Sequence, residues 1–341
     1  MTTRLPRPDY FSHPLVALHA HLVNDHSRIE AMNLFAPLFQ RAWGDWLRIG
    51  QAAFDARIDG PGDETLKALQ RDGVVLLKMD QAIKARITEL VGSQVDAIQA
   101  SLAACDGKPA FRDMHAQLVK ADWEEVYDLM TRALADLHVF EVASAYVKRP
   151  LRIRQLHVQL NNEHETRLRY GVIDADGIPA RKSDYWHIDG EIWPNFKALL
   201  YLNDVTLEQG PMRYIPGTHR DLDAFETVAR KVNDMLKLHW QHFLSLPDAL
   251  RVHALFGPFM TGEEPEAKVL LQREIACCGE GKDVVLFDNN GVHRGGFVRQ
   301  GSRRIVQILF EPAVSERRSR PSLSAALWRL IASRAKYRRI P

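Results

Sequence analysis

The chain has 341 residues, of which 46% are hydrophobic and 26% are charged, and its formal net charge is only +2 at pH 7. These proportions exclude intrinsic disorder as the main state, because the apolar content is too high and the net charge too low. With 20 glycines and 17 prolines a collagen-like chain is excluded as well. A chain of this length can bury a large core in one or two domains without disulfides.

The cysteines and the N-terminal segment indicate the cellular compartment in which the protein is expected. The three cysteines are Cys105, Cys277 and Cys278, an odd number with one adjacent pair, which makes a poor disulfide framework and predicts a reducing environment. The N-terminal segment lacks an apolar run followed by a small-residue cleavage site, so we expect no signal peptide. No stretch reaches the roughly 18 apolar residues that span a bilayer. These features together predict a cytoplasmic protein.

Residues 1–144 are predicted to form a mainly helical flank that packs on the core. Apolar residues recur at three- and four-residue spacing, which is typical of helices. The helical patterns lie at Ile29–Ile49, Thr65–Arg71, Gln81–Leu102 and Trp123–Leu137. The apolar run GVVLLK at 73–78 is the exception and predicts a short buried strand.

Residues 145–315 are predicted to form a β-rich core. Polar and apolar residues alternate along Leu151–Asn161, so one face of this strand carries Gln155, His157, Gln159 and Asn161. That face either contacts water or lines a polar cavity. Further strands are predicted at 196–205, 212–217, 268–277, 283–288 and 303–312. Short strands without alternating helices favour a β-sandwich or barrel over a parallel α/β sheet.

Two further segments have helical patterns. Residues 221–265 are predicted to be a helical insertion between two core strands, where it could cover a site as a lid. Residues 316–341 predict a basic amphipathic helix. This helix either docks on the core with a solvated basic face or makes peripheral contact with an anionic membrane. No motif supports nucleic-acid binding.

A His-x-Asp pair, His187 and Asp189, is the first candidate for chemistry. In an extended strand these two side chains point the same way and supply two ligands of a two-histidine, one-carboxylate iron site. His293 follows an apolar strand and a turn, and is the candidate for the third ligand. Eleven residues later Arg304 opens the last strand, where it could bind a carboxylate through two parallel hydrogen bonds.

Three segments together resemble the core motifs of the phytanoyl-CoA dioxygenase family. They read WHIDGEIW, LNDVTLEQGPMRYIPGTHR and DVVLFDNNGVHRGGFVRQGSRR, and the resemblance spans about residues 150–312. It implies an α+β protein with a double-stranded β-helix core, also called a jelly roll or cupin-like fold. It also implies an Fe(II) centre held by His187, Asp189 and His293, with 2-oxoglutarate and O₂ as cosubstrates and no catalytic residue beyond the metal centre.

The resemblance assigns roles to further residues. Arg304 matches the arginine that pairs with the distal carboxylate of 2-oxoglutarate, with Arg303 on the opposite side of the strand. Contacts to the cosubstrate are predicted for Gln155, His157 and Gln159, and contacts to the substrate for Trp193 and Asn161. Gly295 departs from the family, because several relatives have a hydroxyl residue at that position.

The carboxylate of Asp189 bears on the reaction. Halogenating relatives have a small residue at this position, so Asp189 implies hydroxylation of an unactivated C–H bond instead. The expected substrate is a small organic molecule, lipid-like or a specialised metabolite. Two alternatives remain: a non-catalytic structural or binding member of the same fold, and a metal-dependent hydrolase that uses the same ligands.

Overall fold

The computed structural model describes residues 52–104, 114–163, 186, 196–219, 271–279 and 281–313. Three predicted helical segments lie outside these residues: Ile29–Ile49, the insertion at 221–265 and the C-terminal segment 316–341. No helix in the described part of the chain is long and apolar enough to cross a membrane.

Five helices are described: α3 (Asp63–Asp72), α4 (Gln81–Leu90), α5 (Gly92–Ala103), α6 (Glu124–Asp136) and α7 (Val139–Val147). The single helix predicted over Gln81–Leu102 is interrupted between Leu90 and Gly92, where glycine has a low helix propensity. The carboxylate of Asp80 caps α4 by accepting hydrogen bonds from the next turn. Helix α3 ends at Asp72 and is followed by Gly73, whose φ of 80° is a conformation that glycine adopts without a steric penalty.

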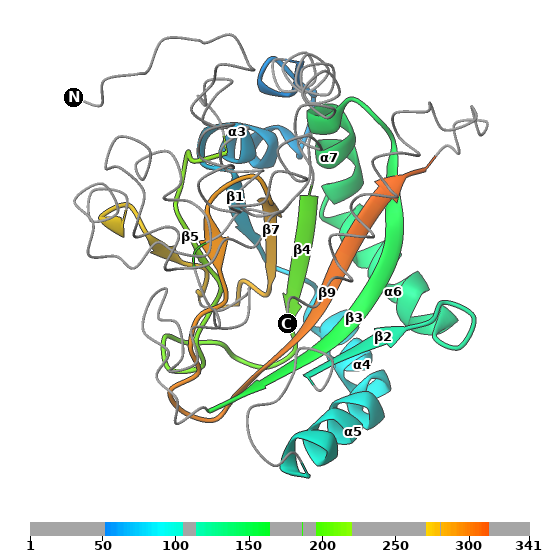
Figure 1. Cartoon of the computed structure of the whole chain (residues 1–341). Helices are drawn as coiled ribbons and strands as arrows, with labels where there is room; N and C mark the ends of the chain where they lie inside the picture. Colours follow the sequence, from blue (N-terminus) through cyan, green and yellow to red (C-terminus); the bar gives the residue numbers. More distant parts are fainter. Residues whose placement is uncertain are drawn as a thin grey trace, which may run out of the picture.

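The larger sheet has six antiparallel strands in the order β1-β7-β4-β9-β3-β2 (Figure 1). Their bounds are β1 (Val74–Leu77), β2 (His115–Leu118), β3 (Leu151–Asn162), β4 (Phe196–Tyr201), β7 (Val284–Asp288) and β9 (Ser302–Pro312). The strand predicted from GVVLLK is confirmed as β1. Both β1 and β2 come from residues 1–144, so the predicted helical flank and the β-rich core share one sheet.

The smaller sheet has three strands in the order β6-β5-β8. They are β5 (Arg213–Tyr214), β6 (Ile275–Ala276) and β8 (His293–Arg294). Strands β5 and β6 fall within predicted strands but are shorter, and β8 lies in a segment for which no strand was predicted. The two sheets together form the jelly-roll core of the predicted α+β fold.

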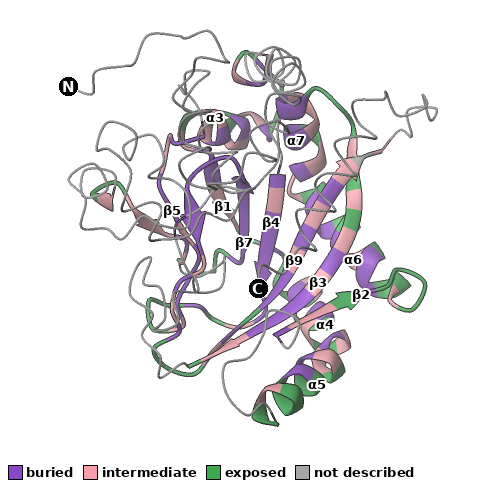
Figure 2. Ribbon diagram, in the orientation of Figure 1, coloured by how far each residue is buried: buried purple, intermediate pink, exposed green. Residues whose placement is uncertain are grey.

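The two faces of the larger sheet pack against different layers. One face contributes Leu156, Val158, Leu200 and Ile308 to a core cluster that also contains buried residues of α3 to α7. The other face contributes Leu199, Val285 and Ile305 to a second cluster, with Tyr214 of the smaller sheet. Figure 2 shows the resulting burial along β4, β7 and β9. The interior between the two sheets is therefore separate from the interior beneath the helices.

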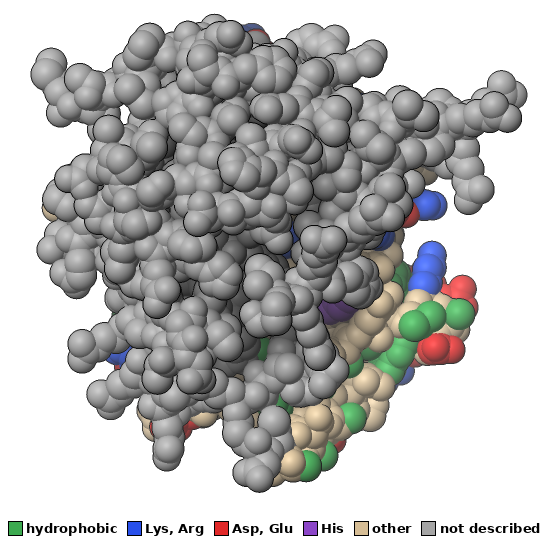
Figure 3. Space-filling view, in the orientation of Figure 1, with side chains coloured by type: hydrophobic (Ala, Val, Ile, Leu, Met, Phe, Trp, Pro, Cys, Tyr) green, Lys and Arg blue, Asp and Glu red, His purple; other side chains and the backbone are tan. Residues whose placement is uncertain are grey.

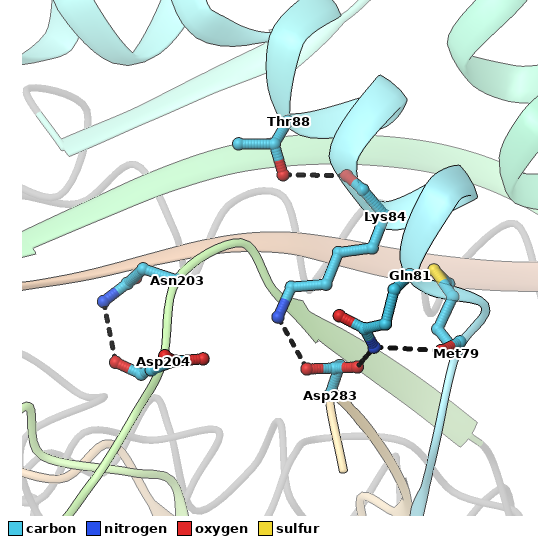
Figure 4. Close-up of polar contacts among 7 residues, drawn as sticks. All are labelled: Met79, Gln81, Lys84, Thr88, Asn203, Asp204 and Asp283. Carbon is cyan, nitrogen blue, oxygen red and sulfur yellow. Dashed lines mark hydrogen bonds and ion pairs between the residues drawn. The ribbon is translucent and has the colours of Figure 1, made fainter. Parts of the chain in front are cut away.

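A buried ion pair joins the helical layer to the larger sheet. The ammonium group of Lys84 on α4 lies 2.6 Å from the carboxylate of Asp283, directly before β7. The amide of Gln81 donates a hydrogen bond of 2.7 Å to the other carboxylate oxygen (Figure 4). Because both charged groups are almost fully buried, each requires the other for compensation.

Candidate active site

The polar face of β3 points into the interior between the two sheets. Directly opposite residues of an antiparallel pair share a face, and Gln159 lies opposite Ile305, which belongs to the core cluster of this interior. Gln155, His157 and Asn161 share that face by the alternation of the strand. Figure 3 shows a histidine surface over β3 and β9. Gln159 is buried on this face, whereas Gln155, His157 and Asn161 are half-buried.

Arg303, and not Arg304, lies on this inward face. Arg303 is opposite Asn161 in the β3–β9 ladder, is 5% exposed, and donates a hydrogen bond of 2.9 Å to the backbone oxygen of Gly296. Arg304 is opposite Leu160, on the face that packs against the helices, and its side chain is exposed. The two arginines lie on opposite sides of β9, as predicted, but Arg303 and not Arg304 shares the face of Gln159 and Asn161. The spacing of eleven residues between His293 and Arg304 does not show which arginine points inward. A loop that is one residue longer or shorter would place each arginine on the opposite face of β9.

His293 begins β8 and is buried on the inner side of the smaller sheet. Its ring stacks with that of Tyr214 at a centroid distance of 6.3 Å and lies 5.1 Å from that of Phe287. Its Nδ1 is 2.8 Å from the backbone oxygen of Gly291. A carbonyl oxygen can only accept, so Nδ1 carries the proton and Nε2 presents the lone pair that a metal ligand needs.

The turn before His293 is organised around the buried carboxylate of Asp288. One carboxylate oxygen accepts hydrogen bonds from the backbone and side-chain nitrogens of Asn290, and the other accepts one of 3.0 Å from the hydroxyl of Tyr146. The Tyr214 hydroxyl donates to the backbone oxygen of Asp288 at 2.9 Å. A Cβ atom at Gly291 would lie 1.8 Å from that hydroxyl, so only glycine fits there. The motif DNNG signalled a turn in the sequence, but nothing in it indicated Tyr146.

Asn161 offers a donor beside Arg303. Its side-chain oxygen accepts a hydrogen bond of 3.0 Å from Gln159, while its buried Nδ2 has no hydrogen-bond partner among the described residues. A buried amide donor without a partner is costly unless a ligand or water satisfies it. Asn161 and Arg303 therefore form a neighbouring pair of donors suited to a carboxylate.

His157 lies further along the same face and is held in its neutral form. Burial lowers the pKa of His157 from its ordinary value of 6.5, and the positive charge of Lys197 lowers this pKa further. Gln307 lies directly opposite His157 on β9. This part of the inward face therefore offers an uncharged imidazole and an amide.

Three predicted site residues, His187, Asp189 and Trp193, lie outside the described residues. Within the described part of the chain, no group of three or more histidine, cysteine, aspartate or glutamate side chains is arranged to hold a metal ion. His293 fits the role of a ligand by its burial and by the hydrogen bond at Nδ1. The donors at Arg303 and Asn161 fit a dicarboxylate cosubstrate by charge and hydrogen-bonding capacity.

The jelly-roll core thus has a buried histidine on the smaller sheet and a buried arginine on the inward face of the larger sheet. The family model described as phytanoyl-CoA dioxygenase (PhyH) matches residues 69–306. The chain belongs to this family, and it is an oxygenase-type enzyme that depends on Fe(II) and 2-oxoglutarate. A comparison with curated proteins finds no match.

Several solved structures are similar at low identity. EctD from S. alaskensis with 2-oxoglutarate and 5-hydroxyectoine is 17% identical, with 76% of this chain and 77% of that chain covered and a TM-score of 0.46. AviO1 from Streptomyces viridochromogenes Tue57 is 18% identical, with 73% and 94% covered and a TM-score of 0.42. The α-ketoglutarate-dependent epimerase SnoN from nogalamycin biosynthesis is 16% identical, with 72% and 81% covered and a TM-score of 0.38. At these values no conclusion about reaction or substrate passes to this chain.

Proposed function

We propose that the protein is an Fe(II)- and 2-oxoglutarate-dependent hydroxylase, with His187, Asp189 and His293 as the metal ligands. The observation that carries the proposal is that His293 is buried with its Nδ1 2.8 Å from the backbone oxygen of Gly291, while Arg303 is buried on the inward face of β9. The iron centre, when bound, supplies the coupling of 2-oxoglutarate decarboxylation by O₂ to oxidation of the substrate. The residues of the chain hold, orient and desolvate the reacting groups.

Arg303 is the residue we assign to the distal carboxylate of 2-oxoglutarate, in place of Arg304. A buried guanidinium is strongly favoured by an anionic partner, and its planar donors match the two oxygens of a carboxylate. Asn161, opposite Arg303, is then a second contact to the cosubstrate rather than to the substrate. Its buried Nδ2 would donate to the same carboxylate.

The substrate side of the site is assigned to the other end of the inward face. Gln307 follows Arg303 by four residues, which corresponds to about 13 Å along an extended strand. His157 lies opposite Gln307 and is neutral, so it can donate and accept a hydrogen bond. These groups favour a substrate that carries hydroxyl, carbonyl or amide groups beside the C–H bond to be oxidised. Trp193 and the insertion at 221–265 are proposed to cover this end.

Succinate release provides the test. Purified protein with Fe(II), 2-oxoglutarate and O₂ should release succinate, and extracts incubated with this mixture should contain a molecule heavier by one oxygen atom. A His293→Ala variant, checked for folding by circular dichroism, should do neither. Turnover that needs metal but neither 2-oxoglutarate nor O₂ would indicate a hydrolase, and metal binding without succinate would indicate a non-catalytic member of the fold.

A further inference from the structure

Arg294 is a buried cation on the outer side of the smaller sheet. In the pairing of β5 with β8, His293 lies opposite Tyr214 and Arg294 opposite Arg213, so His293 and Arg294 point to opposite faces. Only 2% of Arg294 is exposed. The family function accounts for His293 but gives no reason to bury the arginine beside it.

Two aromatic rings enclose the guanidinium of Arg294. Its central carbon lies 4.8 Å from the ring of Trp186 and 5.1 Å from the ring of Phe297. Trp186 is itself completely buried. A desolvated cation that stacks on a tryptophan is attracted by the negative face of the ring more strongly than it is at an exposed site. The contact therefore holds Trp186 firmly against β8.

A carboxylate completes the surroundings of Arg294. Glu274 is largely buried, forms an ion pair with Arg213, and lies 4.0 Å from Nη2 of Arg294. Arg213 shares the outer face and the carboxylate, but within the described part of the chain only Arg294 lies over the ring of Trp186. Arg213 thus provides a matched control for the aromatic contact.

The positions of these residues in the chain give the contact its significance. Trp186 directly precedes the proposed ligand His187, and Arg294 directly follows the proposed ligand His293. The stacking of Trp186 on Arg294 therefore joins two segments, each of which has a proposed iron ligand directly beside the stacked residue. Because each proposed ligand is bonded directly to one residue of this contact, a contact that fixes Trp186 and Arg294 restricts the backbone that carries both ligands.

We propose that Arg294 is a positioning residue, which fixes the spacing of the two histidine ligands by stacking on Trp186 from the outer side of the sheet. The proposal rests on the proposed function for the assignment of His187 and His293. Arg294 does not contact the metal. It acts by restricting where the backbone on either side of the site can lie, so that the ligands need no rearrangement when the metal binds.

The test compares Arg294→Met with Arg213→Met in the full chain. Methionine keeps much of the apolar volume of the arginine stem but removes the cation. We expect Arg294→Met to raise the Fe(II) dissociation constant by about 10- to 100-fold, the range seen when groups behind a metal ligand are removed. The charge-transfer absorption of the anaerobic Fe(II)–2-oxoglutarate complex should also shift or broaden. Arg213→Met should leave iron affinity within about threefold and this absorption unchanged.

Two further variants keep the proposal falsifiable. Trp186→Leu should reproduce the effect of Arg294→Met, and the double variant should be little worse than either, because both remove one contact. Arg294→Lys keeps the cation and should bind iron more tightly than Arg294→Met, even if the latter folds poorly. Folded Arg294 variants with wild-type iron affinity and absorption would overturn the positioning role while leaving the proposed function intact. If the wild-type chain bound no Fe(II), or if His293→Ala bound it equally well, the proposed function itself would fail.

Discussion

The hydroxyl of Tyr146 on α7 donates a hydrogen bond of 3.0 Å to the carboxylate of Asp288, the last residue of β7. Asp288 in turn holds the turn that leads to His293 through its bonds with Asn290. Helix α7 thus contacts the turn that precedes His293, the proposed metal ligand, although Tyr146 and Asp288 are far apart in the chain. Helix α7 therefore supports the site as well as the core.

Tyr146→Phe should separate these two roles. Removing one donor from a buried carboxylate should lower the free energy of unfolding by about 1–3 kcal/mol, as measured by denaturant titration. Because the carboxylate also orients the turn, Fe(II) affinity should fall several-fold. The control is Tyr127→Phe, because the Tyr127 hydroxyl donates to the backbone oxygen of Leu118 and accepts from the backbone nitrogen of Leu156, away from this turn. Tyr127→Phe should lower stability but leave iron affinity unchanged. Equal iron affinity in the two variants would refute a role of Tyr146 in orienting the turn before His293.

Replacement of each neighbouring arginine should identify the one that binds 2-oxoglutarate. Arg303→Ala should weaken 2-oxoglutarate binding by about 2–4 kcal/mol, or roughly 30- to 1,000-fold in the dissociation constant, because a bidentate, desolvated contact is lost. Arg304→Ala should change the dissociation constant of 2-oxoglutarate by less than twofold, because Arg304 is exposed. Isothermal titration under anaerobic conditions measures both. A larger effect of Arg304→Ala than of Arg303→Ala would refute the assignment of Arg303 to the cosubstrate.

The buried pair of Lys84 and Asp283 should show strong coupling. Lys84→Met leaves the carboxylate buried without its cation and should cost about 3–5 kcal/mol of unfolding free energy. Adding Asp283→Leu should recover part of that loss, because an apolar pair needs no compensation. The control is Lys67→Met, since Lys67 is exposed and water screens its pairs with Asp63 and Glu64, so this substitution should change stability far less than Lys84→Met. A double variant less stable than Lys84→Met would contradict this account.

His157 should make stability depend on pH on the acidic side. Its pKa is lowered in the folded protein, so the unfolded chain binds the proton more readily, and stability falls as pH falls through the unfolded value of about 6.5. His157→Gln should therefore lose less stability than wild type between pH 7.5 and 5.5 in urea titrations. Lys197→Met removes the second cause of the shift and should raise the pKa of His157, as followed by NMR. An unchanged His157 titration in Lys197→Met would exclude the charge effect.

The sequence by itself determined the parts of the fold that depend on local patterns. Alternation of side chains predicted β3 and its polar face, and apolar runs predicted β1, β7 and β9, because burial of one or both faces dictates composition. Three motifs, one of them around His293, indicated the family, which the family model confirms, whereas the role of His293 as a metal ligand stays a prediction. Strands β2 and β8 and helix α7 were not predicted, since short elements with partly polar residues become regular only when a neighbouring strand or layer supports them.

Only the tertiary structure decided which side chains meet. Tyr146 and Asp288, Lys84 and Asp283, and Trp186 and Arg294 are partners across long stretches of chain, and no residue type in either segment specifies the other. The choice between Arg303 and Arg304 is of the same kind. Successive side chains of a strand point to opposite faces, so the face of each arginine follows from the hydrogen-bonded register of β9 against β3, which spacing along the chain does not contain.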